Sequence, residues 1–436
     1  MKRLALVALI GFAAAALGIG IWSLDTAHAG VDEPQYLLTA ISLGEDGSLD
    51  ISDELAQERW RAFADVPPPV QTAVLSDGRQ ISPHDPLLPL ILAIPVRLGG
   101  WLAAKWTLAV LAGLLAAATL ALARNYDVPD KIAVPGAALA AATAPLAVYG
   151  QQVYPELPAA LVTTLAAIAL TRRNTAAAAI AVTALPWLSV KYVPVAAALA
   201  AIVAIRAGRR IPLAAFWAAS GAAYLGVHKI IWGGWTAYAS GDEFARSGEF
   251  GVVGFHPDYP GRTIRLIGLL VDRTFGLAAW QPAYLLLVPA LAWLLTTRPP
   301  HWPVLAAPLA AGWLNASYVA LTMHGYWWPG RQVVVVLPLA VVAILRWLAT
   351  TTPKAQAAAA ALAAAGVAIY ARVLVAGWTG HTTWVHAPDD GSLHPVIAWL
   401  LPDDRTLATG DRILLTLWLL AAAATAYRAV AAARAK

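Results

Sequence analysis

Two adjacent acids begin the segment best suited to chemistry. Asp32 and Glu33 lie in the motif Asp-Glu-Pro-Gln-Tyr, residues 32–36, which closely follows the first apolar run. A carboxylate at the membrane surface can accept a proton from an incoming hydroxyl group, as a general base must. Two acids there are costly to desolvate without a cationic partner. The alternative is structural: Asp32 would cap a helix that runs through Tyr36 and Leu43.

A second polar motif lies at the far end of the same loop, where residues 82–87 read Ser-Pro-His-Asp-Pro-Leu. His84 and Asp85 directly precede the segment 86–98, which is apolar except for Arg97. That segment is too short to span a bilayer, so we expect a helix lying along the membrane surface. The two prolines alone would also explain a helix start at this point.

Three cations lie near the ends of apolar runs, where they could hold an anion. They are Lys191 in the segment 186–192, Arg331 at the end of the segment 324–331, and Arg273 beside Asp272. Arginine and lysine at such sites bind phosphate and stabilise developing negative charge. The structural alternatives are that Lys191 extends towards the interface, that Arg273 pairs with Asp272, and that Arg331 anchors a helix end.

Aromatic residues cluster near the same ends. They are Trp232, Trp235, Tyr238, Tyr326, Trp327 and Trp328. An interfacial aromatic belt explains them best, and sugar stacking is the alternative because Gly233-Gly234 and Pro329-Gly330 let the backbone turn nearby. Tyr154-Pro155-Glu156 adds an acid at a span end, which would orient a donor group or simply start the helix.

Metal and nucleotide chemistry are weakly supported. No His-x-x-x-His or His-Glu-x-x-His spacing is present, and the sequence contains no cysteine. Asp32, Glu33 and His84 could share a divalent ion such as magnesium or manganese, whose preferred ligands include carboxylate oxygens. The chain has no Walker loop and no Rossmann glycine pattern, which argues against a nucleotide-sugar substrate.

The elements that must position these residues are membrane helices. Hydrophobic residues make up 59% of the 436 positions and charged residues 13%, and the mean hydropathy is +0.63. Soluble domains are about half apolar and about a quarter charged, so the composition predicts an all-α integral membrane protein.

Apolar runs predict about twelve spans, with ten or eleven as alternatives. The first extends to about residue 21. The others are 102–123, 132–149, 157–171, 175–187, 192–206, 211–231, 276–297, 303–322, 332–349, 355–377 and 412–430. The short pair at 175–206 is either two tilted spans or one broken element. The basic start followed by an apolar run also resembles a signal peptide, with Ala27-His28-Ala29 as a weak cleavage site, but we expect a retained first span.

The distribution of charge predicts orientation. Arginine and lysine concentrate in one set of links, Arg209 among them, whereas only Asp127 and Asp130 of the acids fall on that side. Short cation-rich loops stay in the cytoplasm, so both termini should be inside. The outer segments are 24–100, 232–262 and 378–411, with short links at 150–156 and 323–331. The net charge of +5 then reflects topology, and no nucleic-acid partner is expected.

The two motifs of the first loop resemble those of the C-type (GT-C) membrane glycosyltransferases, especially the lipid A aminoarabinose transferase and protein O-mannosyltransferase types. In these families an acidic pair follows the first span, and a His-Pro-Pro-Leu-like segment opens a juxtamembrane helix. Here that segment is His84-Asp85-Pro86-Leu87, in which one proline of the usual segment is replaced by Asp85 or displaced. The resemblance covers residues 1–350 and implies a GT-C-type bundle with an outer-face active site.

The resemblance also implies a reaction, in which a sugar passes from a polyprenyl-phosphate donor to an acceptor hydroxyl with inversion. Asp32 would be the general base and Glu33 would orient it or the acceptor. Lys191, Arg331 and Arg273 would hold the phosphate. The lining residues would be Tyr36, His84, Asp85, Tyr154, Glu156, Trp327 and Trp328. The aminoarabinose-transferase branch does not obviously need a metal.

We therefore predict a transferase acting on the outer face of the plasma (inner) membrane, with a glycan, glycolipid or protein acceptor. Residues 1–350 would form the catalytic region, and residues 351–436 would add C-terminal helices with the outer loop 378–411. The main alternative is a transporter or flippase of a lipid-linked or small solute. Transporters usually place ionisable residues near the midplane and often show repeats, and neither feature is visible here. A non-catalytic scaffold is the third possibility.

Overall fold

A computed structural model describes residues 1–208, 210–245, 248–385 and 397–435. Within these ranges the chain is helical, and extended pairing is limited to isolated bridges. Three predictions fall partly outside the described residues. They are Arg209 among the inner cations, residues 246–247 of the expected outer segment 232–262, and residues 386–396 of the expected outer loop 378–411.

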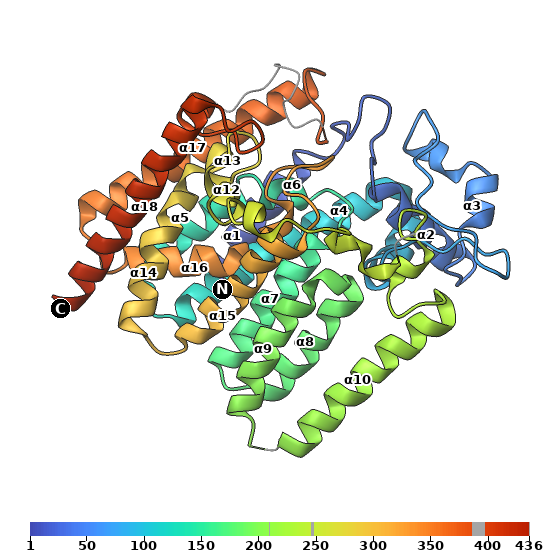
Figure 1. The fold of residues 1–436 in the computed structure, drawn as a ribbon, viewed down its shortest axis with the longest axis horizontal. Helices are drawn as coiled ribbons and strands as arrows, with labels where there is room; N and C mark the ends of the chain where they lie inside the picture. Colours follow the sequence, from blue (N-terminus) through green and yellow to red (C-terminus); the bar gives the residue numbers. More distant parts are fainter. Residues whose placement is uncertain (209, 246–247, 386–396, 436) are drawn as a thin grey trace.

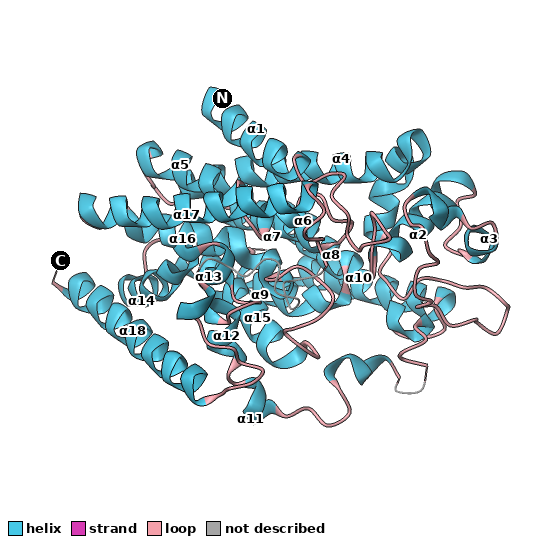
Figure 2. Ribbon diagram, turned by 90° about the horizontal axis from the view of Figure 1, so that it is seen from above, coloured by secondary structure: helices cyan, strands magenta, loops and turns pink. Residues whose placement is uncertain are grey.

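The N-terminal outer segment and the C-terminal helix lie at opposite ends of the molecule. Figures 1 and 2 show α2 (Glu33–Glu45) and α3 (Ser52–Ala56) at one end and α18 (Thr409–Arg434) at the other. Between them, α4 (Leu87–Asn125) packs against α1 (Lys2–Ala16), α2 and α7. The first loop is thus attached to the bundle through α4.

Within the described ranges, four helices are long and apolar enough to cross a bilayer. They are Leu87–Asn125, Arg331–Leu348, Pro353–Trp378 and Thr409–Arg434. Shorter apolar helices cover Glu156–Thr171, Thr175–Leu188 and Pro282–Thr297. These segments confirm a multi-pass membrane protein. The expected total of about twelve spans stays a prediction.

Exposed apolar side chains cover the outside of the C-terminal helices. On α18, Ile413, Leu417 and Leu420 are each more than half exposed, and only 6% of the most apolar window of this helix is buried. A soluble protein would rarely expose so continuous an apolar surface. Contact with lipid tails accounts for it, because lipid removes the cost of exposing apolar groups to water.

Most of the other helices agree with the expected spans within a few residues. They are α7 (Glu156–Thr171), α8 (Thr175–Leu188), α9 (Val193–Arg206), α10 (Arg210–Ile231), α16 (Leu337–Leu348) and α17 (Pro353–Trp378). In the expected span 303–322, α15 (Trp302–Leu314) ends early and is followed by a π-helical turn, Asn315–Val319. The short pair at 175–206 forms two separate helices that pack against each other, with an extended Ser189 between them.

Two of the expected spans are not continuous helices in the structure. The expected span 132–149 is α5 (Asp130–Ala141) and α6 (Leu146–Tyr149), and the expected span 276–297 is α13 (Leu277–Trp280), η5 (Pro282–Leu286) and α14 (Leu287–Thr297). Pro145 and Pro282 stand at two of the breaks, where they cannot donate a helical hydrogen bond.

The expected surface helix at 86–98 forms, but it is joined to the following span. The backbone leaves helical geometry at Gly99 and Gly100, so that Leu87–Leu98 and the rest of α4 are two helices across a kink. Gly100 has φ +62°, a conformation that favours glycine. The kink separates the segment that follows His84 from the span proper.

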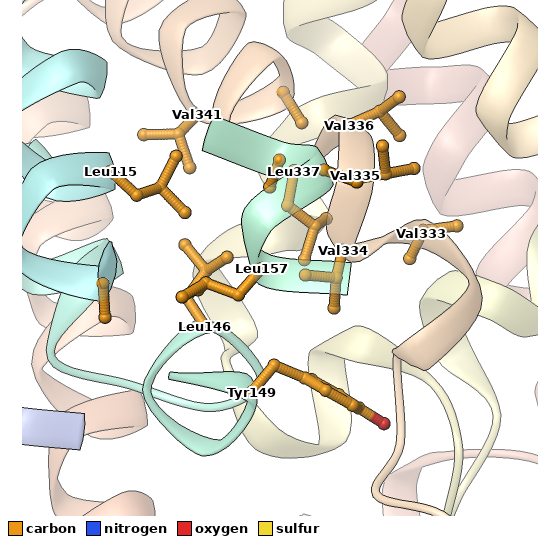
Figure 3. Close-up of a cluster of buried hydrophobic side chains, with 14 of the residues drawn as sticks. Leu115, Leu146, Tyr149, Leu157, Val333, Val334, Val335, Val336, Leu337 and Val341 are labelled. Carbon is orange, nitrogen blue, oxygen red and sulfur yellow. The ribbon is translucent and has the colours of Figure 1, made fainter. Parts of the chain in front are cut away.

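The core beneath the outer links is a cluster of branched aliphatic side chains. Val333–Val336, in the 3-10 turn η7 (Arg331–Val336), are buried, and Figure 3 shows them beside Leu146 and Leu157. Tyr149 extends from this cluster, and its hydroxyl donates a 2.5 Å hydrogen bond to the Trp328 carbonyl. This packing fixes the backbone that carries Arg331.

Ion pairs join three helix ends that we expected on one side of the membrane. Arg3 at the start of α1 and Arg124 at the end of α4 both pair with Asp130 at the start of α5. These three helix ends therefore lie together, as the charge pattern predicted.

Candidate active site

Asp32 and Arg331, far apart in the sequence, form an ion pair in the structure. Arg331 Nη2 donates to Asp32 Oδ2 at 2.7 Å, across 299 residues of chain. Asp32 precedes α2 and occupies the N-cap position, but its side chain makes no capping hydrogen bond. Its carboxylate instead accepts from Arg331 and from Gln71. The helix through Tyr36 and Leu43 that we considered as the structural alternative forms, but Asp32 does not cap it with a side-chain hydrogen bond.

Arg331 also joins a second acid and a second cation. Its Nε donates to Glu156 Oε1 at 2.8 Å, and the same oxygen accepts from Lys191 Nζ at 2.6 Å. Glu156 is fully buried and Arg331 is 7% exposed. We call Asp32, Glu156, Lys191 and Arg331 the ion-pair cluster. It holds two carboxylates and two cations, so its charges balance, as buried charges require.

Local backbone features aim each member of the cluster. Glu156 is the first residue of α7, after the N-cap Pro155. Lys191 lies in the 3-10 turn η2 (Val190–Tyr192) between α8 and α9. Arg331 starts η7 directly after Gly330, whose φ of +84° is a left-handed conformation. A Cβ at Gly330 would lie 3.0 Å from Leu277 and Pro145, so this turn requires glycine.

Aromatic rings enclose the guanidinium of Arg331. Its Cζ lies 4.1 Å from the ring centroid of Tyr154 and 5.3 Å from that of Trp327. Trp328, in contrast, is 1% exposed and packs against Trp280 and Trp384. Of the two tryptophans expected at the site, the structure therefore brings only Trp327 to the ion-pair cluster.

Gln71, which the sequence did not single out, connects Asp32 to His84. Gln71 Nε2 donates to Asp32 Oδ1 at 3.1 Å, and Gln71 Oε1 lies 3.2 Å from His84 Nε2. The His84 ring stacks on Tyr36, with centroids 4.5 Å apart. The expected grouping of Asp32, Tyr36 and His84 thus exists, through a glutamine. A lone glutamine in a loop carries no sequence signal.

Glu33 points away from the ion-pair cluster. Its oxygens accept from Ser23 Oγ at 2.7 Å, Gly30 N at 3.0 Å and Val153 N at 2.8 Å, and Lys105 Nζ lies 3.7 Å away. Because all these partners are buried groups of the protein, Glu33 ties the first loop to the 150–156 link. Glu33 can orient Asp32 only through the backbone, because the two residues are adjacent in the chain. Lys105 could have been found from the sequence, because a lone charged residue within an apolar run is expected to have a buried partner.

Asp85 also binds other parts of the protein. Its Oδ2 accepts from the backbone N–H of Val190 at 2.8 Å, and its Oδ1 accepts from Tyr224 Oη at 2.7 Å and lies 3.0 Å from His228 Nε2. The side chain is buried. Asp85 therefore holds the turn that carries Lys191 and attaches α10 to the first loop.

Arg273 is not brought to the ion-pair cluster. Its Nη2 donates to Asp411 Oδ1 at 2.7 Å, and its Nε donates to the carbonyls of Ala398 and Leu401. It pairs with Asp411 and not with the adjacent Asp272. In this structure Arg273 attaches the segment before α18 to the bundle.

The suggested metal site of Asp32, Glu33 and His84 does not assemble either. Asp32 faces Arg331 and Glu33 faces Val153, so their carboxylates do not converge. Among the described residues, the groups with ligand atoms close enough for one ion are Asp272, His324 and Asp404, and the mostly exposed Asp46, Asp53 and Glu54.

The protonation states of the loop residues follow from burial and from the guanidinium. Burial raises the pKa of Asp32, but the charge of Arg331, with smaller contributions from His84 and Gln71, outweighs it and lowers that pKa to about 2. Burial lowers the pKa of His84, so its imidazole is neutral at pH 7. Asp32 is thus ionised and strongly paired.

Donors and an acceptor remain open within the cluster. Lys191 uses one N–H on Glu156, and in the part of the chain described, Arg331 Nη1 makes no hydrogen bond. Glu156 Oε2 is buried without a partner. Buried polar atoms normally find partners, so a bound anion on the cations and a hydroxyl on Glu156 would complete the site.

A comparison with solved structures finds a protein of similar fold. The chain is similar to ArnT from Cupriavidus metallidurans, in a crystal structure bound to undecaprenyl phosphate, with a TM-score of 0.44 and 15% identity. The match covers 98% of this chain and 75% of that one. No protein-family model and no curated protein matches the chain.

Proposed function

We propose that this protein is a membrane glycosyltransferase that moves a sugar from a polyprenyl-phosphate donor to an acceptor hydroxyl on the outer face of the membrane. The observation that carries the proposal is the ion-pair cluster, in which Asp32, with a side chain 18% exposed, pairs with Arg331, and Arg331 and Lys191 share the carboxylate of Glu156. Such a site combines a proton acceptor with phosphate-binding groups, which are the two requirements of this reaction.

The cations would bind the donor phosphate at the membrane interface. Arg331 Nη1 and the remaining N–H groups of Lys191 are available to phosphate oxygens, while Tyr154 and Trp327 hold the guanidinium in place. The polyprenyl tail would stay in lipid. The acceptor hydroxyl attacks the anomeric carbon, the bond from that carbon to the phosphate oxygen breaks, and polyprenyl phosphate leaves with the electron pair. A single displacement of this kind inverts the anomeric centre.

Asp32 would take the hydroxyl proton. While it is paired with Arg331, its pKa of about 2 makes it a weak base. When a donor phosphate draws the guanidinium towards itself, Asp32 loses part of this stabilisation and its pKa rises. Donor binding would therefore strengthen the base, and His84 would support it through Gln71.

The remaining predictions extend this proposal. The active site would face the outside of the plasma membrane, with residues 1–350 as the catalytic region and residues 351–436 as additional membrane helices. The acceptor would be a cell-envelope glycan, glycolipid or protein hydroxyl.

The test is sugar transfer by purified protein in lipid vesicles, with a panel of radiolabelled polyprenyl-phosphate sugars and extracted envelope acceptors. Asp32→Asn keeps the size of the side chain and removes the base, so transfer should fall by about 10²- to 10⁴-fold. The matched control is Asp77→Asn, which changes an exposed acid of the same loop that pairs only with Arg79. Full transfer by Asp32→Asn would contradict the assigned base.

The flippase alternative is tested in the same vesicles. Movement of labelled donor across the bilayer, without transfer to any acceptor, would replace the transferase proposal. Arg331→Lys sharpens the distinction because lysine keeps the charge but cannot reach Asp32 and Glu156 with a planar fork. A transferase should then lose turnover along with donor affinity.

A further inference from the structure

A second group of polar side chains lies outside the ion-pair cluster and is formed by three distant segments. Asp272 follows α12 (Arg265–Val271), His324 lies in the 320–330 link, and Asp404 lies between η8 (Ala398–Leu400) and α18. His324 Nε2 is 2.8 Å from Asp404 Oδ1 and 3.8 Å from Asp272 Oδ1. We call these three residues the acid–imidazole cluster. Their candidate ligand atoms all lie within 4.8 Å of one another.

The two carboxylates of the cluster are buried, and two of its side-chain atoms have no hydrogen-bond partner among the described residues. The side chains of Asp272 and Asp404 are 1% and 5% exposed. Asp404 Oδ1 and His324 Nε2 face each other, but neither makes a hydrogen bond of proper geometry. Two buried atoms with lone pairs that converge without a hydrogen bond indicate a missing shared partner.

Asp272 is held rigidly by the backbone. Its Oδ1 accepts from the N–H groups of Thr274 at 3.0 Å and Phe275 at 2.6 Å, and its Oδ2 accepts from Asp404 N at 3.1 Å. The His324 ring packs edge-on against Phe275. Such supporting contacts orient metal ligands in proteins.

The charges of this cluster do not balance. Two carboxylates with one imidazole carry at least one net negative charge, whether or not His324 is protonated. Arg265 donates to the carbonyls of Ala320 and Leu321, and Arg273 pairs with Asp411. In the part of the chain described, neither arginine forms an ion pair with the cluster. A divalent cation with neutral His324 would bring the net charge to zero.

We propose that Asp272, His324 and Asp404 bind one divalent transition-metal cation, of the Zn²⁺ or Mn²⁺ class. One imidazole nitrogen with two carboxylate oxygens suits these ions, whereas Mg²⁺ and Ca²⁺ prefer oxygen ligands throughout. Three protein ligands leave a further coordination position for water.

The position of His324 gives the ion a structural role. His324 and Arg331 lie on the same short outer link, with Trp327 between them. A metal on His324 would clamp this link to the segment before α18 and to the end of α12. The ion would therefore hold in place the link that presents Trp327 and Arg331 to the ion-pair cluster.

The test is metal binding by the purified full-length chain in detergent. After chelator treatment, Zn²⁺ and Mn²⁺ are added separately, and bound metal is measured by mass spectrometry together with the shift in melting temperature. We expect one equivalent per chain and a higher melting temperature for the wild type. Both should be lost in His324→Ala and in Asp404→Asn. Retention of one equivalent in these variants, or no stoichiometric binding by the wild type, would overturn the proposal.

Two controls keep the result specific. His381→Ala removes an exposed outer histidine that contacts Thr379, and it should bind metal as the wild type does. Glu54→Gln tests the other acidic group, and loss of the metal in this variant alone would place the ion there and contradict the proposal. A readout that needs no variant is the visible spectrum of Co²⁺ bound to the wild type, which reports imidazole ligation and low coordination number. A spectrum typical of six oxygen ligands would also contradict the assignment.

Discussion

The ion-pair cluster and the acid–imidazole cluster are both made largely by links between helices, yet they differ in charge. The ion-pair cluster contains two acids and two cations, with Arg331 bridging both acids. The acid–imidazole cluster contains two acids around one histidine. Both are largely buried. Buried acids need compensating positive charge. In the ion-pair cluster the chain supplies that charge, whereas in the acid–imidazole cluster part of it must come from a bound cation.

The ion-pair cluster is complete as a folded element, since each acid has a cation of the protein. It would bind its substrate by exchanging contacts, with a phosphate drawing Arg331 and Lys191 from their acids. Among the described residues, the two acids of the acid–imidazole cluster have only His324 as a possible cationic partner, so binding of a cation would add stability to the cluster. Without metal, removing one acid should therefore destabilise the ion-pair cluster much more than the acid–imidazole cluster.

The largest expected effect is that of Glu156→Gln. This variant leaves Lys191 and Arg331 with only one acid between them, so the buried cluster gains a net positive charge. Breaking a buried ion pair on one side typically costs about 3–5 kcal/mol of stability. We expect a clear fall in melting temperature in detergent. Combining it with Lys191→Met should recover much of the loss, and equal losses in the single and double variants would refute the charge-balance argument.

A smaller effect is expected from pH at Asp32. Its folded-state pKa is about 2 against an ordinary 3.8, so the ionised form is favoured by the fold. The stabilisation is fully present well above pH 3.8 and is lost as the pH falls through 2; it amounts to about 2 kcal/mol at pH 7 and about half of that at pH 3.

The measurement is the difference in unfolding free energy between wild type and Asp32→Asn at pH 7, 5 and 3. That difference should be the same at pH 7 and 5 and smaller at pH 3. A difference that grows as the pH falls would have the wrong sign. Asp77→Asn serves as the exposed control.

Gln71→Leu should have a smaller effect again. It removes the hydrogen bond to Asp32 and the contact with His84, but leaves the pair of Asp32 with Arg331 intact. A single hydrogen bond to a charged group contributes about 1.5–3 kcal/mol at most, and a partly exposed one about 1 kcal/mol. We expect a several-fold loss of transfer, with donor affinity unchanged. Loss as large as that of Asp32→Asn would make Gln71 part of the proton-transfer path itself.

The smallest effect is expected from Asp404→Asn in chelator-treated protein. Removing one acid from an excess of acids relieves repulsion and offsets the lost contacts, so stability should change by no more than about 1 kcal/mol. Thermal unfolding without metal, beside Glu156→Gln under the same conditions, makes the comparison directly. Asp403→Asn is the neighbouring control. Destabilisation equal to that of Glu156→Gln would mean that the acid–imidazole cluster is balanced without metal.

Local sequence patterns determined the helical membrane class and several spans. The helices Pro353–Trp378 and Thr409–Arg434 coincide with the expected spans, because an uninterrupted apolar run of this length has few alternatives to a membrane helix. Residue type and position also indicated Asp32, Lys191, Glu156 and Arg331 as site residues. An ionisable residue beside an apolar run needs a partner, and the structure supplies one for each.

Only the tertiary structure decided which partners meet. Asp32 and Glu33 are adjacent, but successive residues at a helix start point about 100° apart, and the sequence does not say which one faces Arg331. Arg273 was assigned to the donor phosphate and instead pairs with Asp411. These choices depend on the packing of segments far apart in the chain. Helical periodicity and hydropathy report only neighbours within a few turns, so they could not reveal these long-range contacts.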